Sequence, residues 1–257
     1  MVRLDAMHHT VRKYLGGGLS FIPLEDEKPR RILDVGCGSG AWAIQAALEF
    51  PQAEIIALDK TPLPARTLPE NLHFTLANLQ DPLPFENQTF DVVHARLVLC
   101  HVTNAREVLS RVAQLVKPGG LLLLEDSDVK NLSETGQPAS LRACMSNMIA
   151  AWGRRGADLE VGSKLKEFVE ETGRFEEVRI KKALCAFGAQ NPDASETERE
   201  LGREFQDSWT RSLPAMAMMP AASGLTDELV NEHLRELEEF GSSGCFGLYF
   251  CVARRSQ

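Results

Sequence analysis

The stretch that most constrains the fold is RILDVGCGSGAW, residues 31–42. Its first half is apolar and partly β-branched, as in a buried parallel strand, and Gly36, Gly38 and Gly40 follow directly before a helical pattern. Glycines let a backbone approach a ligand closely, and the free N–H groups of a first helical turn face outward. The stretch therefore predicts a strand, a tight turn and a helix that together bind something polar.

Two classes of cofactor are bound at such a junction. Gly36, Gly38 and Ala41 also satisfy the dinucleotide pattern, and Asp59 ends the next predicted strand where a ribose-binding acid falls. Asp34, however, lies inside the strand just before the first glycine, where a carboxylate repels a pyrophosphate but pairs with an ammonium or sulfonium. The residues favour a cationic ligand. A nicotinamide-dependent reductase is the weaker alternative, because no tyrosine is followed four residues later by the lysine that short-chain reductases need.

The segment ILDVGCGSG resembles motif I of the class I S-adenosylmethionine-dependent methyltransferases. Further segments follow in that family's order, namely IIALDK, ANLQDPLPFENQTFDVVHAR, the pair HV and LVKPGGLLLLED. The phrases RLDAMHH and FDVVHARLVL also resemble fungal secondary-metabolism methyltransferases related to a global regulator of such pathways. The resemblance implies an α/β fold with a doubly wound, seven-stranded, mostly parallel sheet, an antiparallel last strand and S-adenosylmethionine as cofactor.

The resemblance also implies which residues bind the cofactor. Asp59 takes the place of the ribose-binding acid, and Asn78 and Leu79 take the place of the adenine-binding turn, where many members have Asp instead of Asn. The full set of expected cofactor-binding residues is Asp34, Gly36, Cys37, Gly38, Gly40, Asp59, Lys60, Asn78, Leu79, Ala95 and Arg96.

Two residues are candidates for catalysis. An imidazole such as that of His101 can take a proton from a hydroxyl or thiol as the methyl group arrives. The alternative is that His101 caps or packs beside the following helix. Glu125, expected with Asp126 and Asp128 after the fifth strand, is a second candidate base. A magnesium site is disfavoured because the fourth strand ends with His94 and not with a carboxylate.

The methyl acceptor is expected to contact the two segments with least family signal. These are an N-terminal segment, residues 1–30, and a helical insertion, residues 189–243, which flank a core of residues 31–188 and a final strand within residues 244–257 of a single domain. A surface helix in the first segment and a dimer contact in the second are the alternatives. The candidate substrate-binding residues are His8, Tyr14, Trp209, Met216 and Met219.

Periodicity and capping signals place the other elements. Strands are expected at residues 54–58, 72–76, 90–94, 121–124, 175–187 and 245–253, and helices at 4–14, 104–116 and 141–152. Ser163 is expected to cap a helix that Gly173 ends, and Ser195 with Glu198 forms a capping box.

Composition narrows the function further. A net charge of −8 and a pI near 5.4 argue against a nucleic acid partner. The six cysteines form no C-x-x-C pair, which favours reduced thiols in a cytoplasmic protein, and no apolar run is long enough to span a membrane. The sequence thus predicts methyl transfer to an O, N or S nucleophile of a small molecule, with a regulatory protein that acts through protein partners as the alternative.

Overall fold

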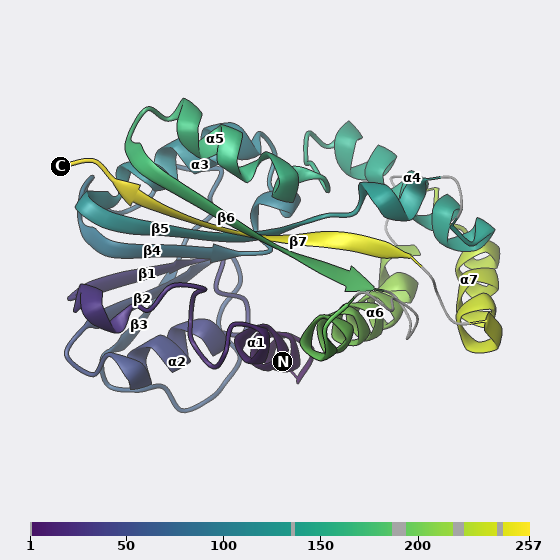
Figure 1. Cartoon of the computed structure of the whole chain (residues 1–257), viewed down its shortest axis with the longest axis horizontal. Coiled ribbons are helices and arrows are strands. Elements are labelled where there is room, and N and C mark those ends of the chain that lie inside the picture. Colours follow the sequence, from purple (N-terminus) through teal and green to yellow (C-terminus); the bar gives the residue numbers. More distant parts are fainter. Residues whose placement is uncertain (1, 135–136, 187–193, 218–223, 241–243) are drawn as a thin grey trace.

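A single sheet organises the computed structural model, which describes residues 2–134, 137–186, 194–217, 224–240 and 244–257 (Figure 1). The strand order is β3-β2-β1-β4-β5-β7-β6. The first five strands are parallel, and β7 runs antiparallel to both β5 and β6. The predicted fold class is confirmed. The strands are β1 (Arg31–Val35), β2 (Glu54–Asp59), β3 (Leu72–Leu76), β4 (Phe90–Arg96), β5 (Val116–Asp128), β6 (Phe175–Ala186) and β7 (Cys245–Arg255).

Helices cover both faces of this sheet. In Figure 1, α3 and α5 lie on one side of the sheet and α2 lies on the other, while α4 and α7 lie beyond the ends of the strands. Apolar residues at helical spacing, such as Val108, Leu109 and Val112 in α3, are buried against the strands. The helices are α1 (Val2–Tyr14), α2 (Ala41–Glu49), α3 (Ala105–Gln114), α4 (Ala139–Arg154), α5 (Leu165–Glu171), α6 (Glu196–Ala217) and α7 (Asp227–Phe240).

The strand order reverses between β1 and β4. The chain leaves β1 toward β2 on one side, and it later returns to place β4 on the other side of β1. In an open parallel sheet a ligand binds in the crevice outside the carboxyl ends of the strands at such a reversal. The turns that follow β1, β2 and β4 therefore define where a site can form.

The helical insertion places α6 beside α1. The predicted capping box starts α6, because Ser195 Oγ accepts from the Glu198 N–H (3.3 Å) and Glu198 accepts from the Ser195 N–H (2.9 Å). Lys13 of α1 pairs with Glu200 of α6 at 2.7 Å, and Arg3 Nη1 donates to Ser208 Oγ at 2.6 Å. The N-terminal segment and the insertion thus form one helical layer next to the sheet (Figure 1).

Three expected element boundaries were wrong. The helix expected to reach residue 116 ends at Gln114, because Val116 already pairs with Phe90 as part of β5. β5 then continues to Asp128, since β7 pairs with it over that whole length. Ser163 lies in a 3-10 turn and makes no cap to α5, which begins only at Leu165.

A buried polar cluster joins α4, α6 and α7, which together form what we call the outer helical layer. His233 of α7 is 1% exposed, and its Nε2 accepts from Trp209 Nε1 of α6 at 3.2 Å. Its Nδ1 lies 3.0 Å from Ser140 Oγ of α4, and the Ser140 hydroxyl donates to Glu236. The imidazole therefore carries its hydrogen on Nδ1 and is neutral. Burial lowers the pKa of His233, against the attraction of Glu236.

We expect this cluster to make the outer helical layer sensitive to acid. Because the pKa of His233 is lower in the folded protein than its ordinary value of 6.5, its contribution to stability is present above that value and is lost as the pH falls below it. Thermal unfolding should show a larger fall in midpoint from pH 7.5 to pH 5.5 for the wild type than for His233→Asn. An equal fall in both proteins would show that the cluster does not titrate with folding.

Candidate active site

A cavity of about 650 Å³ lies at the carboxyl ends of the parallel strands. The turn after β1, the ends of β2 and β4, the loop after β3, the start of α1 and the end of α4 all contribute to it. Its lining residues are Arg3, Leu4, Met7, His8, Asp34, Gly36, Cys37, Gly38, Ser39, Ala41, Trp42, Leu58, Asp59, Lys60, Ala77, Asn78, Leu79, Gln80, His94, Arg96, Leu97, Val98, His101, Val102, Thr103, Trp152, Arg155 and Ala157. The reversal of strand order thus does mark a ligand-sized space.

The glycine turn after β1 forms one wall of the cavity. Gly36 has a φ of +67°, and a Cβ atom there would lie 2.5 Å from a methyl carbon of Val98. Gly38 has a φ of +55°, which side chains other than glycine rarely adopt. Cys37 lines the cavity between them, and burial raises the pKa of its thiol well above the ordinary value. The turn is therefore fixed by sterics and brings the backbone close to any ligand.

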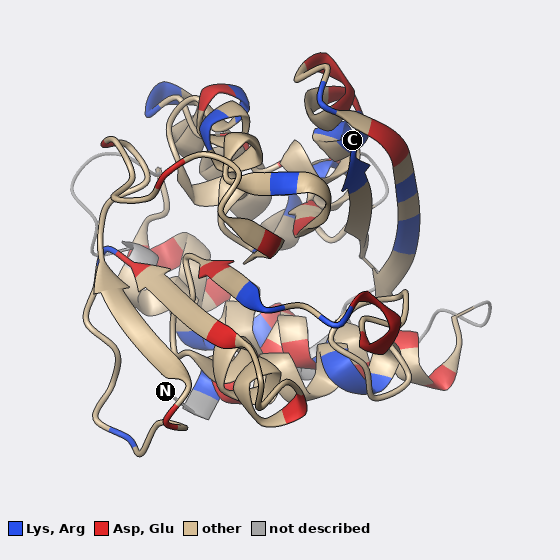
Figure 2. Cartoon of the chain, turned by 90° about the vertical axis from the view of Figure 1, so that its left-hand side faces the viewer, with Lys and Arg blue, Asp and Glu red and all other residues tan. Residues whose placement is uncertain are grey.

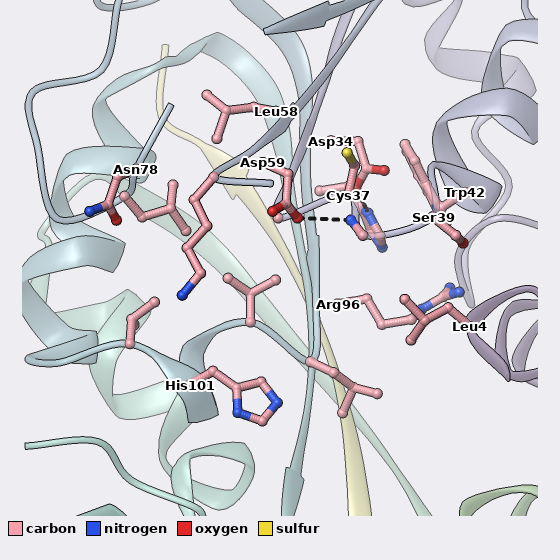
Figure 3. Close-up of a pocket in the computed structure, with 18 of the residues that line it drawn as sticks. Leu4, Asp34, Cys37, Ser39, Trp42, Leu58, Asp59, Asn78, Arg96 and His101 are labelled. Carbon is pink, nitrogen blue, oxygen red and sulfur yellow. Dashed lines mark hydrogen bonds and ion pairs between the residues drawn. The ribbon is translucent and has the colours of Figure 1, made fainter. Parts of the chain in front are cut away.

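Asp59 at the end of β2 is tied to the glycine turn. Its Oδ2 accepts from the Gly38 N–H and its Oδ1 from the Thr61 N–H, both at 2.9 Å. Each carboxylate oxygen keeps a lone pair for a ligand. Figure 3 shows Asp59 in the cavity wall with Asn78 on one side and Asp34 on the other. The carboxylate is thus held where two hydroxyl groups of a ribose can donate to it.

Asp34 presents a buried carboxylate oxygen that has no protein partner. Its Oδ1 lies 2.8 Å from His94 Nδ1, and that imidazole stacks on Trp42 with 3.8 Å between ring centroids. Its Oδ2 is buried and makes no hydrogen bond among the described residues. An unpaired buried carboxylate oxygen is costly unless a ligand satisfies it. The group that fits this wall of the cavity is a cation or a hydrogen-bond donor.

Arg96, which is partly buried, forms an ion pair with buried Glu125. The guanidinium donates through Nε and, at 3.0 Å, through Nη2 to the two carboxylate oxygens, and its Nη1 lies 3.0 Å from His8 Nδ1. Burial alone would raise the pKa of Glu125, but Arg96 and His94 hold it at about 2. Glu125 also lies outside the cavity lining. Its assignment as a second candidate base was wrong, because a carboxylate of such low pKa that is paired on both oxygens does not take up a proton.

His101 faces the cavity from a 3-10 turn, Leu99–His101, that follows β4. Buried Asp126 of β5 holds this turn by accepting from the backbone N–H groups of Leu99 (2.9 Å) and Cys100 (3.2 Å). Burial raises the pKa of Asp126 to about 6. Figure 3 shows His101 across the cavity from Asp34 and Asp59. Asp126 was expected to reach the cavity, but it lies beneath the turn and positions His101 instead.

The expected adenine-binding residues lie together at one side of the cavity. Asn78 and Leu79 both line it, and Asn78 Oδ1 accepts from the Gln80 N–H at 3.1 Å. The side-chain amide of Asn78 keeps its two N–H donors for a ligand. Leu58 lies on the same wall (Figure 3), so this side offers apolar surface and amide groups.

The structure places several other expected residues away from the cavity. Tyr14 stacks on Phe250 at 5.6 Å, and burial with nearby Glu198 raises its pKa to about 12. Trp209 bonds to His233 in the outer layer, and Gly40 and Ala95 do not reach the lining. These residues do not line this cavity, and their expected binding roles stay predictions. The Met216 side chain and all of Met219 lie outside the described part of the chain.

The sequence analysis assigned no binding role to many of the lining residues, among them two from α1 and two from the end of α4. Arg3 and Met7 lie one helical turn apart in α1, the helix that also carries the predicted His8. Trp152 and Arg155 lie at the end of α4. The Thr103 hydroxyl fixes this last segment by donating to the Arg155 carbonyl at 3.0 Å. No sequence pattern links α4 with the cavity, because a long-range contact alone brings the helix there.

Comparison with known proteins assigns the family. Residues 7–161, more than half of the chain, match the family described as a methyltransferase domain. The chain belongs to the class I S-adenosylmethionine-dependent methyltransferases. The family that the resemblance of several segments implied is confirmed, and S-adenosylmethionine is the cofactor.

Two curated fungal proteins and one solved structure illustrate the similarity. Methyltransferase str2 of Strobilurus tenacellus is 35% identical over 99% of this chain and 92% of its own length. N-methyltransferase gliN of Aspergillus fumigatus is 27% identical over 94% of this chain and 88% of its own length. A Haemonchus contortus phosphoethanolamine N-methyltransferase superimposes with a TM-score of 0.53 at 18% identity, over 89% of this chain and 49% of that one, and shares the fold.

Within the residues that the structure describes, no group of three His, Cys, Asp or Glu side chains is arranged to hold a metal ion. No helix in the described segments is long and apolar enough to cross a membrane. On the side of the molecule shown in Figure 2, basic and acidic residues are interspersed over the helices.

We expect the Arg96–Glu125 pair to be essential for stability. In Arg96→Met, Glu125 is left as an unpaired buried charge, which typically costs about 3–5 kcal/mol. Denaturant unfolding should show a loss of that size. The control is Arg211→Met, which removes an exposed pair with Asp207 and should change stability by less than about 1 kcal/mol. Similar losses in the two variants would contradict the assignment.

Proposed function

We propose that this methyltransferase transfers the methyl group of S-adenosylmethionine to an O, N or S nucleophile of a small molecule, a secondary metabolite. The observation that carries the proposal is the cavity wall made by Asp34 and Asp59. One carboxylate has a buried oxygen without a partner, and the other is fastened to the glycine turn beside it. This wall suits a ligand that combines a positive charge with ribose hydroxyls.

The lining residues divide between the two reactants in this proposal. The glycine turn and Asp34 bind the methionine part of the cofactor, Asp59 binds the ribose, and Asn78 with Leu79 binds the adenine. The facing wall, with His101, Trp152 and Arg155, binds the methyl acceptor. The curated fungal relatives, whose names include an N-methyltransferase, support a small-molecule acceptor.

The cofactor supplies an electrophilic methyl group on a sulfonium. What the chain contributes is alignment of the two reactants in a cavity with little water, which can account for about 7–11 kcal/mol of the barrier. The buried Arg96, Glu125, His94 and Asp34 side chains keep the strand ends rigid for that purpose. We also propose that residues 1–257 act as one domain, in which α1 borders the cavity and α6 packs against α1.

The direct test is ligand binding followed by an activity screen. We expect S-adenosylhomocysteine to bind with micromolar affinity in titration calorimetry and NADH not to bind. Phenols, carboxylic acids, amines and thiols should then be screened with S-adenosylmethionine for methylated product. Binding of NADH in place of S-adenosylhomocysteine would overturn the proposal, and binding without turnover of any acceptor class would favour a regulatory protein.

We expect Asp59→Ala to weaken S-adenosylhomocysteine binding about 10- to 100-fold, because it removes the charge-assisted hydrogen bonds to the ribose. Calorimetry measures the change. Asp128→Ala is the matched control. Asp128 also ends a strand, and its Oδ1 accepts from the Lys130 N–H, two residues later, at 3.0 Å. It lies outside the cavity lining. Equal affinity of both variants for the ligand would remove Asp59 from the site.

A further inference from the structure

Among the residues that the structure describes, the acceptor side of the cavity offers hydrogen-bond donors and cations but no proton acceptor. From this we propose that the methyl acceptor is an oxygen acid that enters the cavity already ionised, such as a carboxylate, and that His101 and Arg155 bind the anion. The inference rests on the proposed methyl transfer and adds the chemical class of the acceptor. It gives His101 the role of a donor in place of the general base expected from the sequence.

His8 cannot act as a base in this cavity. Its Nδ1 lies 3.0 Å from Arg96 Nη1, and a guanidinium can only donate. The Nδ1 lone pair is therefore occupied, and the hydrogen of the neutral ring is on Nε2, which is buried without a protein partner. Burial and the charge of Arg96 lower the pKa of His8 to about 3, so the ring stays neutral at physiological pH. His8 thus presents an N–H group.

The imidazole of His101, like that of His8, has its Nδ1 occupied by a donor. Its Nδ1 accepts a long hydrogen bond from the indole Nε1–H of Trp152, at 3.5 Å. An indole can only donate, so the hydrogen of the neutral His101 ring is on Nε2 as well. Desolvation and the nearby cations Lys60, Arg3 and Arg155 lower the pKa of His101, which keeps the ring neutral. The nitrogen left for the acceptor is again a donor.

The cations beside His101 have no carboxylate partner. Among the described residues, neither Arg3 nor Arg155 makes an ion pair: Arg3 donates to the Ser208 hydroxyl at 2.6 Å, and the Arg155 guanidinium lies 5.8 Å from the centre of the Trp152 ring. The charge of Arg3 acts to lower the pKa of Glu204, which burial and Asp207 raise overall. In a protein of net charge −8, unpaired cations that line a cavity attract an anion.

Asp34 and Asp59, the carboxylates among the described lining residues, lie on the wall opposite His101. Asp34 bonds to His94 and Asp59 to backbone N–H groups, and both lie across the cavity from His101 (Figure 3). The described part of the chain thus provides no base beside a phenol or alcohol bound next to His101. A carboxylic acid has lost its proton near pH 4 and needs none.

The methyl transfer balances without a proton acceptor. A lone pair of the acceptor oxygen forms the new O–CH₃ bond while the S–CH₃ bond breaks, and the electron pair of the broken bond stays on sulfur. The negative charge of the oxygen and the positive charge of the sulfonium are lost together. His101 Nε2–H and Arg155 hold the anion in line, and no group gains or loses a proton.

Binding of matched probes to the protein saturated with S-adenosylhomocysteine tests the inference. Three aryl carboxylates of increasing size (phenylacetate, 1-naphthylacetate and biphenyl-4-carboxylate) are compared by calorimetry with their uncharged amides. We expect at least one acid to bind and its amide to bind at least 10-fold more weakly. The Arg155→Gln variant should bind the same acid with about 10-fold lower affinity. S-adenosylhomocysteine affinity should be unchanged in this variant, and Arg154→Gln, a neighbour outside the lining, should leave acid binding unchanged.

The tautomer of His101 gives a readout that does not depend on the probe. Nitrogen-15 NMR of the imidazole rings should show hydrogen on Nε2 for His101 at neutral pH, and Trp152→Phe should release that preference. Hydrogen on Nδ1 in the wild type, equal binding of acids and amides, or binding of neither would overturn the inference. If S-adenosylhomocysteine itself does not bind, the proposed function fails first, so the two failures are distinguishable.

Discussion

The buried charges that link β1, β4 and β5 are the interaction on which the rest of the site depends. Asp34 is the register partner of His94, and Arg96 is the register partner of Glu125, so the four side chains are neighbours on adjacent strands. Each of these polar side chains alone would be costly to bury, but Asp34 Oδ1 contacts His94 and both oxygens of Glu125 are bonded to Arg96, while Asp34 Oδ2 is left for a ligand. The site is therefore built on strands, whose relative positions are fixed by the backbone ladder.

Because side chains alternate along β5, this one strand holds both Arg96 and the turn that carries His101. Glu125 points to the ion pair with Arg96, and Asp126, the next residue, points to the other face and holds the turn that carries His101. A one-residue shift of β5 would exchange the two carboxylates and disrupt both walls. The long antiparallel pairing of β5 with β7, from Leu121 to Asp128, prevents such a shift.

The sequence predicted the parts of the fold that local pattern determines. Apolar runs, glycines and the Ser195 capping box located the strands, the turn and α6, and Asp59 was placed correctly at the cavity because the strand and its end were both recognisable. The roles of Glu125 and Asp126 could not be predicted in this way. Glu125 also pairs in register with Arg96 of β4, and from Asp126 to Asp128 the strand pairs with β7, more than a hundred residues later.

The acceptor side of the cavity shows the same limit more strongly. Trp209 and Trp152 both lie on amphipathic helices, and nothing in either pattern tells which indole faces the other helices and which faces the cavity. The difference arises from their partners: Trp209 donates to a buried histidine of the outer layer, whereas Trp152 donates to His101. That second contact determines which imidazole nitrogen is left for the acceptor. A tertiary hydrogen bond, and not the identity of the histidine, thus decides between a base and a donor.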